Sequence, residues 1–390
     1  MYLKRLYILL LVGVFCLPSL KLYSLTIKDI EENSYSEIYC VGQDGSRYYF
    51  WSGASGGPQI KLDYARTPNI DDIVGYYVSK FSSSGELKYS TKLPFKGILF
   101  GDIKFRILEE NKDSAFLLVT GASAEAFNYF YAFDSLGNIV WKSDAKLPSF
   151  CCPAGIFRRD DGTVLYFGKV PRYFKVFHFD WNGRKEVQIL DSFIDYSKQL
   201  LGLPSIRDWR VARLGNDCFL VVGFKSSLNR DILRGTKTIG DYIHIFSFLV
   251  NSEGEMLDSI CLDNAEGNAA IVPVNRNSIG TTGKGFFDNF DYFRMPDSSL
   301  IFVFGVWPRW KEKEWQEANF PLYIVKFTKD GKLVPLTSKP KVLPLTSLPY
   351  GYRIKGFAYR VSPTREFWDY AVDSLGNFYV EIRKYSFKRK

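Results

Sequence analysis

The chain has 390 residues, of which 46% are apolar and 17% are aromatic, and its formal net charge is +9. An apolar fraction of this size excludes an intrinsically disordered protein, and the many Phe and Tyr residues favour the half-buried surfaces of β-sheets. The basic residues are spread along the sequence instead of forming one stripe, which argues against a nucleic-acid-binding protein.

The N-terminal segment is typical of an export signal. Lys4 and Arg5 precede an apolar run over Leu6–Leu17. A charged start followed by an apolar run that is too short to span a bilayer comfortably predicts a secretory signal peptide. We place it at residues 1–24 and expect cleavage after its last residue.

Two alternatives to cleavage remain for this segment: an uncleaved N-terminal membrane anchor, or lipidation at Cys16. In each case we expect an exported protein that is periplasmic, at the cell surface or secreted, with one domain over residues 25–390. The five cysteines beyond the segment are odd in number and irregularly spaced, so they predict no disulfide framework.

Two nearly identical octapeptides show that the chain contains internal repeats. Tyr131–Asn138 reads YAFDSLGN, and Tyr370–Asn377 reads YAVDSLGN. Related turns, each preceded by an apolar run, end at Gly85, Gly183, Gly254 and Gly331. Glycine is favoured where a tight turn between two strands needs a positive φ, so these segments predict β-hairpins.

A second pattern lies upstream of each turn: an alternating strand, a polar turn, and an aliphatic or aromatic strand that usually ends in Gly. One example is Arg158–Gly168, RRDDGTVLYFG. Together the two patterns define a unit of four antiparallel strands joined by tight turns and one variable loop. We place copies at about 35–93, 102–143, 155–190, 208–262, 290–338 and 356–390.

Units of this kind resemble bacterial β-propeller repeats of the NHL-like and quinoprotein-like type, whose blades carry a D-G turn and a D-x-x-G-N turn. The resemblance covers nearly the whole chain after the leader. It implies an all-β protein, a β-propeller of about six four-stranded antiparallel blades, with five or seven as alternatives. It concerns architecture only and implies no activity.

The last copy fits two registers. In one register Tyr370–Asn377 is the turn between the third and fourth strands. In the other it is the turn between the first and second strands, and the fourth strand is missing. Leu25–Ile30 could then supply the missing strand and cover an edge that would otherwise favour aggregation.

The long loops predict the binding face of such a propeller. Tight turns alternate with long connections along each copy, so the long connections of neighbouring copies should gather on one face of the disc, where repeat proteins usually bind partners. Trp and Arg dominate binding hot spots. The candidate ligand-binding residues on these loops are Trp307, Arg309, Trp310, Trp315, Arg230 and Arg234. The alternative is that these tryptophans plug the top of the disc as a small core.

A series of arginines closes the first strand in five copies: Arg106, Arg158, Arg213, Arg294 and Arg360. One interpretation is a basic ring at the channel that suits an anionic ligand. The other interpretation, which the repetition favours, is a structural device in which each Arg binds a nearby turn carboxylate or carbonyl. Asp161 and Asp297 are candidate carboxylates for this role.

Catalytic motifs are weak in this sequence. Gly53–Gly57 matches G-x-S-x-G, but the polar segment that follows does not predict the helix that a nucleophile elbow needs. We therefore identify no catalytic residue and expect no metal and no cofactor. The adjacent Cys151 and Cys152 leave two alternatives open, a strained disulfide between neighbours or two reduced thiols.

These patterns favour an exported, non-enzymatic binding or scaffold protein, which recognises a polysaccharide or a protein through its long-loop face. We expect a monomer that binds no nucleic acid and meets a membrane only through an uncleaved anchor. The main alternative is an enzyme that acts on a glycan or an oxidisable small molecule at the mouth of the channel. Acids on the long loops, namely Asp231, Asp241, Asp263, Glu266 and Asp288, would be available to it.

Overall fold

A computed structural model describes part of the chain, and all structural statements below concern that part. The described residues are 25–33, 38–54, 73–94, 104–111, 114–121, 127–145, 152–161, 163–170, 173–180, 183–189, 208–226, 243–258, 261–265, 267–274, 291–305, 320–336, 339–361 and 364–386. They form strands, the short helix α2 (Ile27–Asn33) and the 3-10 turn η5 (Leu345–Ser347).

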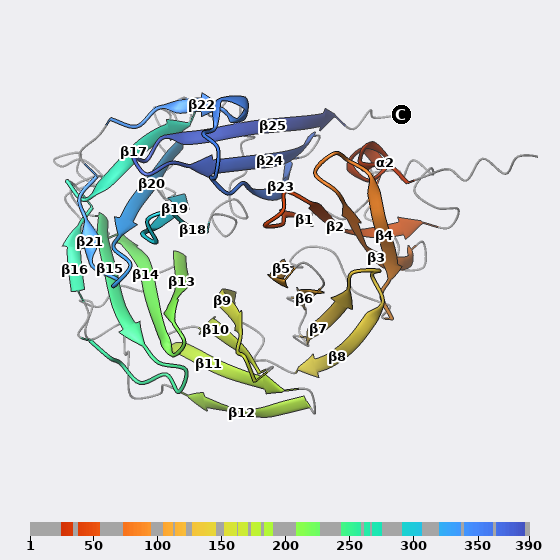
Figure 1. The fold of residues 1–390 in the computed structure, drawn as a ribbon, viewed down its shortest axis with the longest axis horizontal. Coiled ribbons are helices and arrows are strands. Elements are labelled where there is room, and N and C mark those ends of the chain that lie inside the picture. Colours follow the sequence, from red (N-terminus) through yellow and green to blue (C-terminus); the bar gives the residue numbers. More distant parts are fainter. Residues whose placement is uncertain are drawn as a thin grey trace, which may run out of the picture.

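The strands form six separate sheets that lie around a common axis (Figure 1). We number these sheets 1 to 6 in chain order. In each sheet one end of the hydrogen-bonded order lies nearest the axis, and the remaining strands lie progressively further out (Figure 1). These innermost strands are β1, β5, β9, β13, β18 and β23. The predicted all-β, propeller-like architecture is therefore confirmed.

Sheets 1 to 4 share one plan: four consecutive strands, each antiparallel to the next. Sheet 1 contains β1 (Ile38–Val41), β2 (Arg47–Ala54), β3 (Ile73–Phe81) and β4 (Leu87–Lys92), and sheet 2 contains β5 (Lys104–Asn111), β6 (Ser114–Gly121), β7 (Phe127–Asp134) and β8 (Ile139–Ala145). Sheet 3 contains β9 (Cys152–Arg158), β10 (Val164–Val170), β11 (Tyr173–Asp180) and β12 (Gly183–Ile189), and sheet 4 contains β13 (Asp208–Gly215), β14 (Cys218–Ser226), β15 (Ile243–Val250) and β16 (Cys261–Asn264).

Sheet 5 departs from this plan at its outer edge. Its inner strands are β18 (Tyr292–Arg294), β19 (Leu300–Gly305) and β20 (Phe320–Phe327). The short β21 (Leu333–Val334) pairs only with the end of β20, and β17 (Ala269–Val274) pairs with the rest. The outer edge is thus completed by β17, a segment that lies between the predicted fourth and fifth copies.

Sheet 6 contains β23 (Lys355–Val361), β24 (Thr364–Val372) and β25 (Phe378–Ser386), which are antiparallel. Its outermost strand is β22 (Val342–Pro344), which runs parallel to β25. The strand that completes this sheet thus comes from the segment just before it.

Leu25–Ile30 does not supply a strand, so that part of the prediction is wrong. Thr26 and Asp29 explain why the segment is helical instead. The backbone N–H and the hydroxyl of Thr26 donate to Asp29 Oδ2 at 2.8 and 2.6 Å, and the Asp29 N–H donates to Thr26 Oγ1 at 3.2 Å. This reciprocal capping box satisfies donors that the first turn of a helix leaves open. Helix α2 therefore begins at Ile27 despite the alternating pattern of the sequence.

The repeated D-S-L-G-N turns owe their shape to the aspartate side chain. Asp134 Oδ1 accepts hydrogen bonds from the N–H groups of Leu136 and Asn138, and Oδ2 accepts one from the Asn138 side chain. Asp373 makes the same three bonds with Leu375 and Asn377. The hydrogen bonds from Asn138 hold the pKa of Asp134 below its usual value.

Each of the two octapeptide turns packs against the preceding sheet. Gly137 (φ 83°) lies against Tyr89 on the outer strand of the preceding sheet, and Gly376 (φ 85°) lies against Ile324 and Ala270 of the preceding sheet. In sheet 6, however, Tyr370–Asn377 joins β24 to β25, which are the second and third strands counted from the axis. Neither predicted register describes this sheet, because β22 occupies its outer edge.

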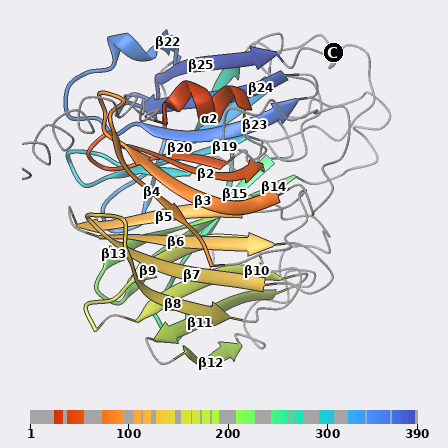
Figure 2. The same ribbon diagram turned by 90° about the vertical axis from the view of Figure 1, so that its right-hand side faces the viewer.

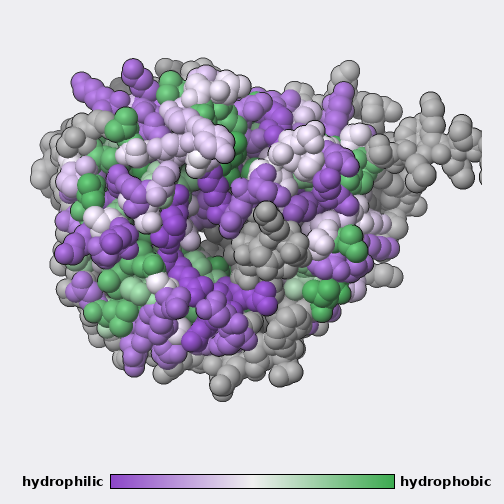
Figure 3. Space-filling model, viewed as in Figure 1, coloured by the Kyte–Doolittle hydropathy of each residue, from purple (hydrophilic) through white to green (hydrophobic). Residues whose placement is uncertain are grey.

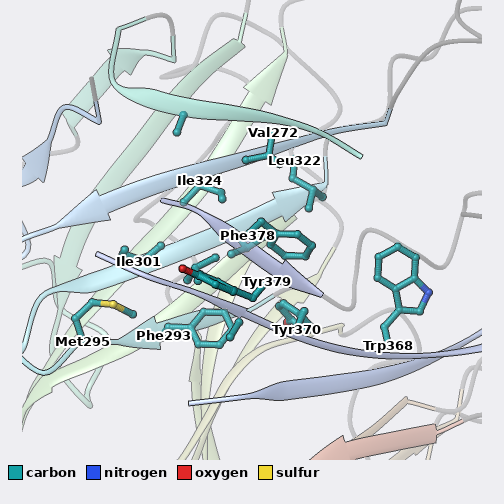
Figure 4. Packing of buried hydrophobic residues seen from close by; sticks show 14 of the residues in the cluster. Val272, Phe293, Met295, Ile301, Leu322, Ile324, Trp368, Tyr370, Phe378 and Tyr379 are labelled. Carbon is teal, nitrogen blue, oxygen red and sulfur yellow. The ribbon is translucent and has the colours of Figure 1, made fainter. Parts of the chain in front are cut away.

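Buried apolar side chains fill the gaps between neighbouring sheets. One cluster joins sheets 5 and 6 through Phe293, Met295, Trp368 and Tyr370 (Figure 4). Similar clusters join sheets 3 and 4, sheets 4 and 5, and sheets 6 and 1. The core is therefore divided among the sheet interfaces, as the alternating aromatic and aliphatic strands require.

Candidate functional site

The six candidate ligand-binding residues, Trp307, Arg309, Trp310, Trp315, Arg230 and Arg234, lie outside the described residues. They belong to the connections from β19 to β20 and from β14 to β15. Their proposed role in binding therefore stays a prediction.

The strands place tight turns and long connections at opposite ends of the sheets. In sheets 4 and 5 the tight turns join the first strand to the second and the third to the fourth. Because successive strands are antiparallel, the connections between second and third strands must begin and end at the opposite face. Figure 2 shows the disc from its side, with the sheets stacked edge on. We call the face of the tight turns the short-turn face.

An ion pair joins the innermost strands of sheets 5 and 6. Asp291 precedes β18, and its Oδ2 accepts a hydrogen bond from Lys355 Nζ, at the start of β23, at 2.8 Å. Lys355 Nζ also lies 5.0 Å from the ring centre of Tyr292 and 5.4 Å from that of Phe293. Both charged side chains are partly buried, with 24% of Asp291 and 16% of Lys355 exposed. A partly exposed carboxylate is thus fixed at the axial side of the sheets.

Hydrogen bonds of the predicted arginine series connect neighbouring sheets around the axis. Arg213 Nη1 donates to the backbone carbonyl of Arg158 in the preceding sheet at 3.0 Å. Arg294 Nη2 in turn donates to the carbonyl of Arg213. Arg213 Nε also bonds the carbonyl of Gly215 in its own turn at 3.0 Å. The carbonyl part of the structural interpretation is confirmed for Arg213 and Arg294.

The proposed turn carboxylates have other partners. Asp161 accepts from the Thr163 N–H at 2.8 Å and lies 3.9 Å from Arg159. Asp297 accepts from Ser299 and lies 3.6 Å from Lys326. The hydrogen bonds from their own turns lower the pKa of both aspartates. The expected pairing of Asp161 and Asp297 with the arginine series is therefore not observed.

A group of buried charged side chains lies where sheets 1 and 6 meet under helix α2 (Figure 1). Glu31, on α2, is fully buried. Its Oε1 accepts from Tyr49 at 2.7 Å and from Arg383 Nη2 at 3.2 Å, and its Oε2 accepts from Tyr385 at 2.6 Å. One carboxylate thus ties the N-terminal helix to both sheets.

Arg383 connects Glu31 to a second buried carboxylate, Asp369. Arg383 Nη1 donates to Asp369 Oδ2 at 2.8 Å, and Tyr39 donates to Oδ1 at 2.6 Å. Arg47 Nη2 lies 3.6 Å from Oδ2. We call these seven residues the clasp: Glu31, Tyr39, Arg47, Tyr49, Asp369, Arg383 and Tyr385.

The electrostatics of the clasp keep its phenols neutral and the guanidinium of Arg383 charged. Burial, followed by the charge of Asp369, raises the pKa of Tyr39 well above its usual value, so the phenol stays a donor. Burial alone would lower the pKa of Arg383, but Asp369, Tyr39 and Glu31 outweigh it and raise this pKa. Every carboxylate oxygen of Glu31 and Asp369 accepts a hydrogen bond, so the clasp is suited to holding two sheets together and not to reacting with a substrate.

The backbone also approaches closely at this interface. A Cβ at Gly356 of β23 would stand 2.3 Å from Tyr39 Cε1 and 2.9 Å from Val41 Cγ2 of β1. Only glycine allows this approach of the innermost strands, so the first and last sheets are in direct contact.

Metal-site and membrane signals are absent from the described part of the chain. There, no three His, Cys, Asp or Glu side chains gather as ligands for a metal ion. No helix within the same residues has the length and apolar character needed to cross a bilayer.

Comparison with known proteins finds no matching family model and no matching curated protein. Among solved structures, the chain is similar to a protein of unknown function from Bacteroides caccae (12% identity, TM-score 0.37, 77% of this chain and 93% of that one). It is similar to the GH43 β-xylosidase/α-arabinofuranosidase CoXyl43 from a compost microbial metagenome (12% identity, TM-score 0.35, 79% of this chain and 96% of that one). It is also similar to a bifunctional GH43-CE protein of Bacteroides eggerthii (10% identity, TM-score 0.40, 92% of this chain and 52% of that one).

The prediction of a non-enzymatic binding or scaffold protein is wrong on this finding, because the similar structures include glycoside hydrolases. The corresponding expectation that the chain is not an enzyme is corrected with it. With identities of 10–12% and TM-scores of 0.35–0.40, the likeness carries no argument for a reaction or a substrate of this chain.

The sequence analysis missed the Asp291–Lys355 pair and the clasp. Asp291 follows a long polar segment and precedes a strand of three residues, so no periodicity marked it. In the clasp, Tyr39 and Asp369 are 330 residues apart. The charged residues Arg365, Glu366 and Asp369 in the otherwise largely apolar β24 were the available signal, because charges in a buried strand require partners.

Proposed function

We propose that the chain is an exported enzyme that acts on a glycan in the axial channel of a closed, six-bladed propeller. Each of the six sheets would be one blade, with sheets 6 and 1 joined by the clasp. The repeats would belong to the NHL-like or quinoprotein-like type. Residues 1–24 would direct export, in keeping with their charged start and apolar run.

The observation that carries the proposed activity is the carboxylate of Asp291 on the axial side of the innermost strands. Its ion pair with Lys355 at 2.8 Å fixes its position, and its side chain stays partly exposed. A fixed carboxylate stabilises the positive charge that develops on a sugar ring when a glycosidic bond breaks.

Glycoside hydrolysis needs a second carboxyl group as proton donor. Of the acids expected on the long connections, Asp263 lies on β16, the outermost strand of sheet 4, and thus far from the axis. Asp231, Asp241, Glu266 and Asp288 lie outside the described residues. We propose Asp288 as the partner, because it precedes Asp291 by only three positions.

The test is release of reducing sugar from a panel of plant and microbial polysaccharides and aryl glycosides. We expect turnover by the purified protein and a loss of about 100-fold or more in Asp291→Asn, since electrostatic and acid–base contributions are of this order. Asp288→Asn should lose activity to a similar extent.

The matched control is Asp160→Asn, an exposed aspartate in a tight turn next to another innermost strand. It should keep full activity, and the melting temperature of each variant shows whether it is folded. An absence of turnover on every glycan, or full activity in folded Asp291→Asn, would contradict the proposal.

A further inference from the structure

The innermost strands of sheets 4 to 6 bring three arginines to the short-turn end of the axis: Arg213, Arg294 and Arg353. Arg213 and Arg294 are next to the tight turns that follow β13 and β18, and Arg353 precedes β23. Arg294 and Arg353 are exposed, and Arg213 is half-buried. We call these residues the axial arginines. Hydrophilic residues border part of the central hollow on this face (Figure 3).

The charges of the axial arginines are not compensated. Arg213 and Arg294 bind backbone carbonyls, which are neutral and orient a guanidinium without cancelling its charge. Among the described residues, no carboxylate lies within 4.0 Å of any of the three. The aspartates of this face are engaged elsewhere: Asp161 by Arg159, Asp297 by Lys326 and Asp291 by Lys355.

The axial arginines lie near the ion pair of Asp291 and Lys355. Arg294 Nη2 donates to the backbone carbonyl of Arg213, so the side chain of Arg294 reaches from sheet 5 to sheet 4. Arg353 precedes Lys355 by two positions, and Lys355 Nζ binds Asp291 and lies 5.0 Å from the ring centre of Tyr292. Burial raises the pKa of Tyr292 to about 12, and the charges of Arg294 and Arg353 oppose this rise. Positive charge from three sheets is therefore gathered beside Asp291.

From this arrangement we propose that the axial arginines bind the carboxylate or sulfate group of an acidic sugar. Guanidinium groups recognise such groups with paired, charge-assisted hydrogen bonds. The identification of the ligand as a sugar rests on the proposed function, whereas the anion site itself does not. An acidic sugar bound there would lie next to Tyr292 and Asp291.

A single anionic group fits this site better than a polyanion. Binding of nucleic acid requires a basic stripe that follows many phosphates. Here the short-turn face alternates cations with aspartates, and Lys80, Arg159 and Lys326 each pair with an aspartate. The three axial arginines are too few for a stripe of phosphates, which favours one carboxylate or sulfate.

The experiment is calorimetric titration of the mature protein with trigalacturonate, its fully methyl-esterified form and a sulfated galactose trisaccharide. Methyl esterification keeps the sugar and removes the charge. We expect the ester to bind at least tenfold more weakly than the acid, because a hydrogen bond to a charged group contributes about 1.5 kcal/mol or more. The sulfated sugar shows whether carboxylate or sulfate is preferred.

The double variant Arg294→Gln, Arg353→Gln should lose at least tenfold in affinity for the acidic ligand, with an unchanged melting temperature. Arg159→Gln is the matched control, because Arg159 lies on the same face but pairs with Asp161. It should bind within twofold of the wild type. Folded Asp291→Asn should still bind, so a failure of catalysis is distinguishable from a failure of anion binding.

Three results would overturn the inference. The ester could bind as tightly as the acid, the double variant could bind like the wild type, or neither the carboxylated nor the sulfated sugar could bind at millimolar concentration. An equal loss of affinity in Arg159→Gln would indicate general electrostatic attraction by the short-turn face and would also contradict a specific site.

Discussion

The clasp and the axial arginines use the same side chain in opposite ways. In the clasp, Arg383 lies between two buried carboxylates and has 22% of its side chain exposed. At the axis, Arg213 and Arg294 bind backbone carbonyls, and Arg294 is exposed. The difference depends on the partner of the guanidinium. A buried carboxylate neutralises the positive charge and stabilises the fold, whereas a backbone carbonyl leaves the positive charge available to a ligand.

The largest expected effect comes from removing a charge of the clasp. Asp369→Asn leaves Arg383 with one carboxylate less, and breaking a buried ion pair costs about 3–5 kcal/mol. We expect a loss of about 3 kcal/mol in the free energy of unfolding, measured by urea titration. The control is Glu381→Gln, an exposed acid on β25 that is not part of the clasp. An equal loss in both variants would show that the clasp does not hold the sheets together.

Much of the fold follows from local chemistry that the sequence displays. The D-S-L-G-N turns, for example, are specified by an Asp that binds two N–H groups and a Gly with positive φ. The edge strands of sheets 5 and 6 were not predictable in this way. β22 contributes three residues in a parallel pairing, and its partner β25 begins 34 positions further along the chain.

The candidate site was even harder to predict from the sequence than the edge strands. Its charged pair and the clasp depend on contacts between distant segments, and a single sequence holds no record of such contacts. Helix α2 is the exception, because the spacing of Thr26 and Asp29 is a local capping signal. The alternation of apolar and polar residues in Leu25–Ile30 favoured a strand more strongly, so this capping signal was not recognised.

A second, smaller effect tests the packing that accompanies the clasp. In Gly356→Ala the new Cβ would collide with Tyr39, so β1 and β23 must separate. Overpacking of this kind costs about 1–3 kcal/mol. Gly215→Ala is the control, since a Cβ there meets no atom within 4 Å. Thermal unfolding of the two variants measures the difference, and an unchanged melting temperature in Gly356→Ala would contradict the close approach.

The smallest effect concerns pH and separates the turn aspartates from the axial arginines. Hydrogen bonds from Ser299 lower the pKa of Asp297 in the folded state. A lowered folded pKa contributes stability that is present above the unfolded value of about 4 and is lost as the pH falls through the folded value. Stability should therefore fall below about pH 4, and less steeply in Asp297→Asn.

Thermal melts between pH 3 and pH 6 measure this dependence. Arg294→Gln should follow the wild-type curve, because Arg294 and Asp297 are not an ion pair. A flattened curve in Arg294→Gln would show that the turn aspartates do compensate the axial charges.

The most direct test of the whole account compares the free energies of unfolding of Arg383→Gln and Arg294→Gln by urea titration at neutral pH. We predict a loss of about 3 kcal/mol or more for Arg383→Gln, because two buried carboxylates lose their cation. Arg294→Gln should lose less than about 0.5 kcal/mol, as is usual for an exposed side chain. Similar losses in the two variants would contradict the claim that one guanidinium holds the fold together and the other is available to a ligand.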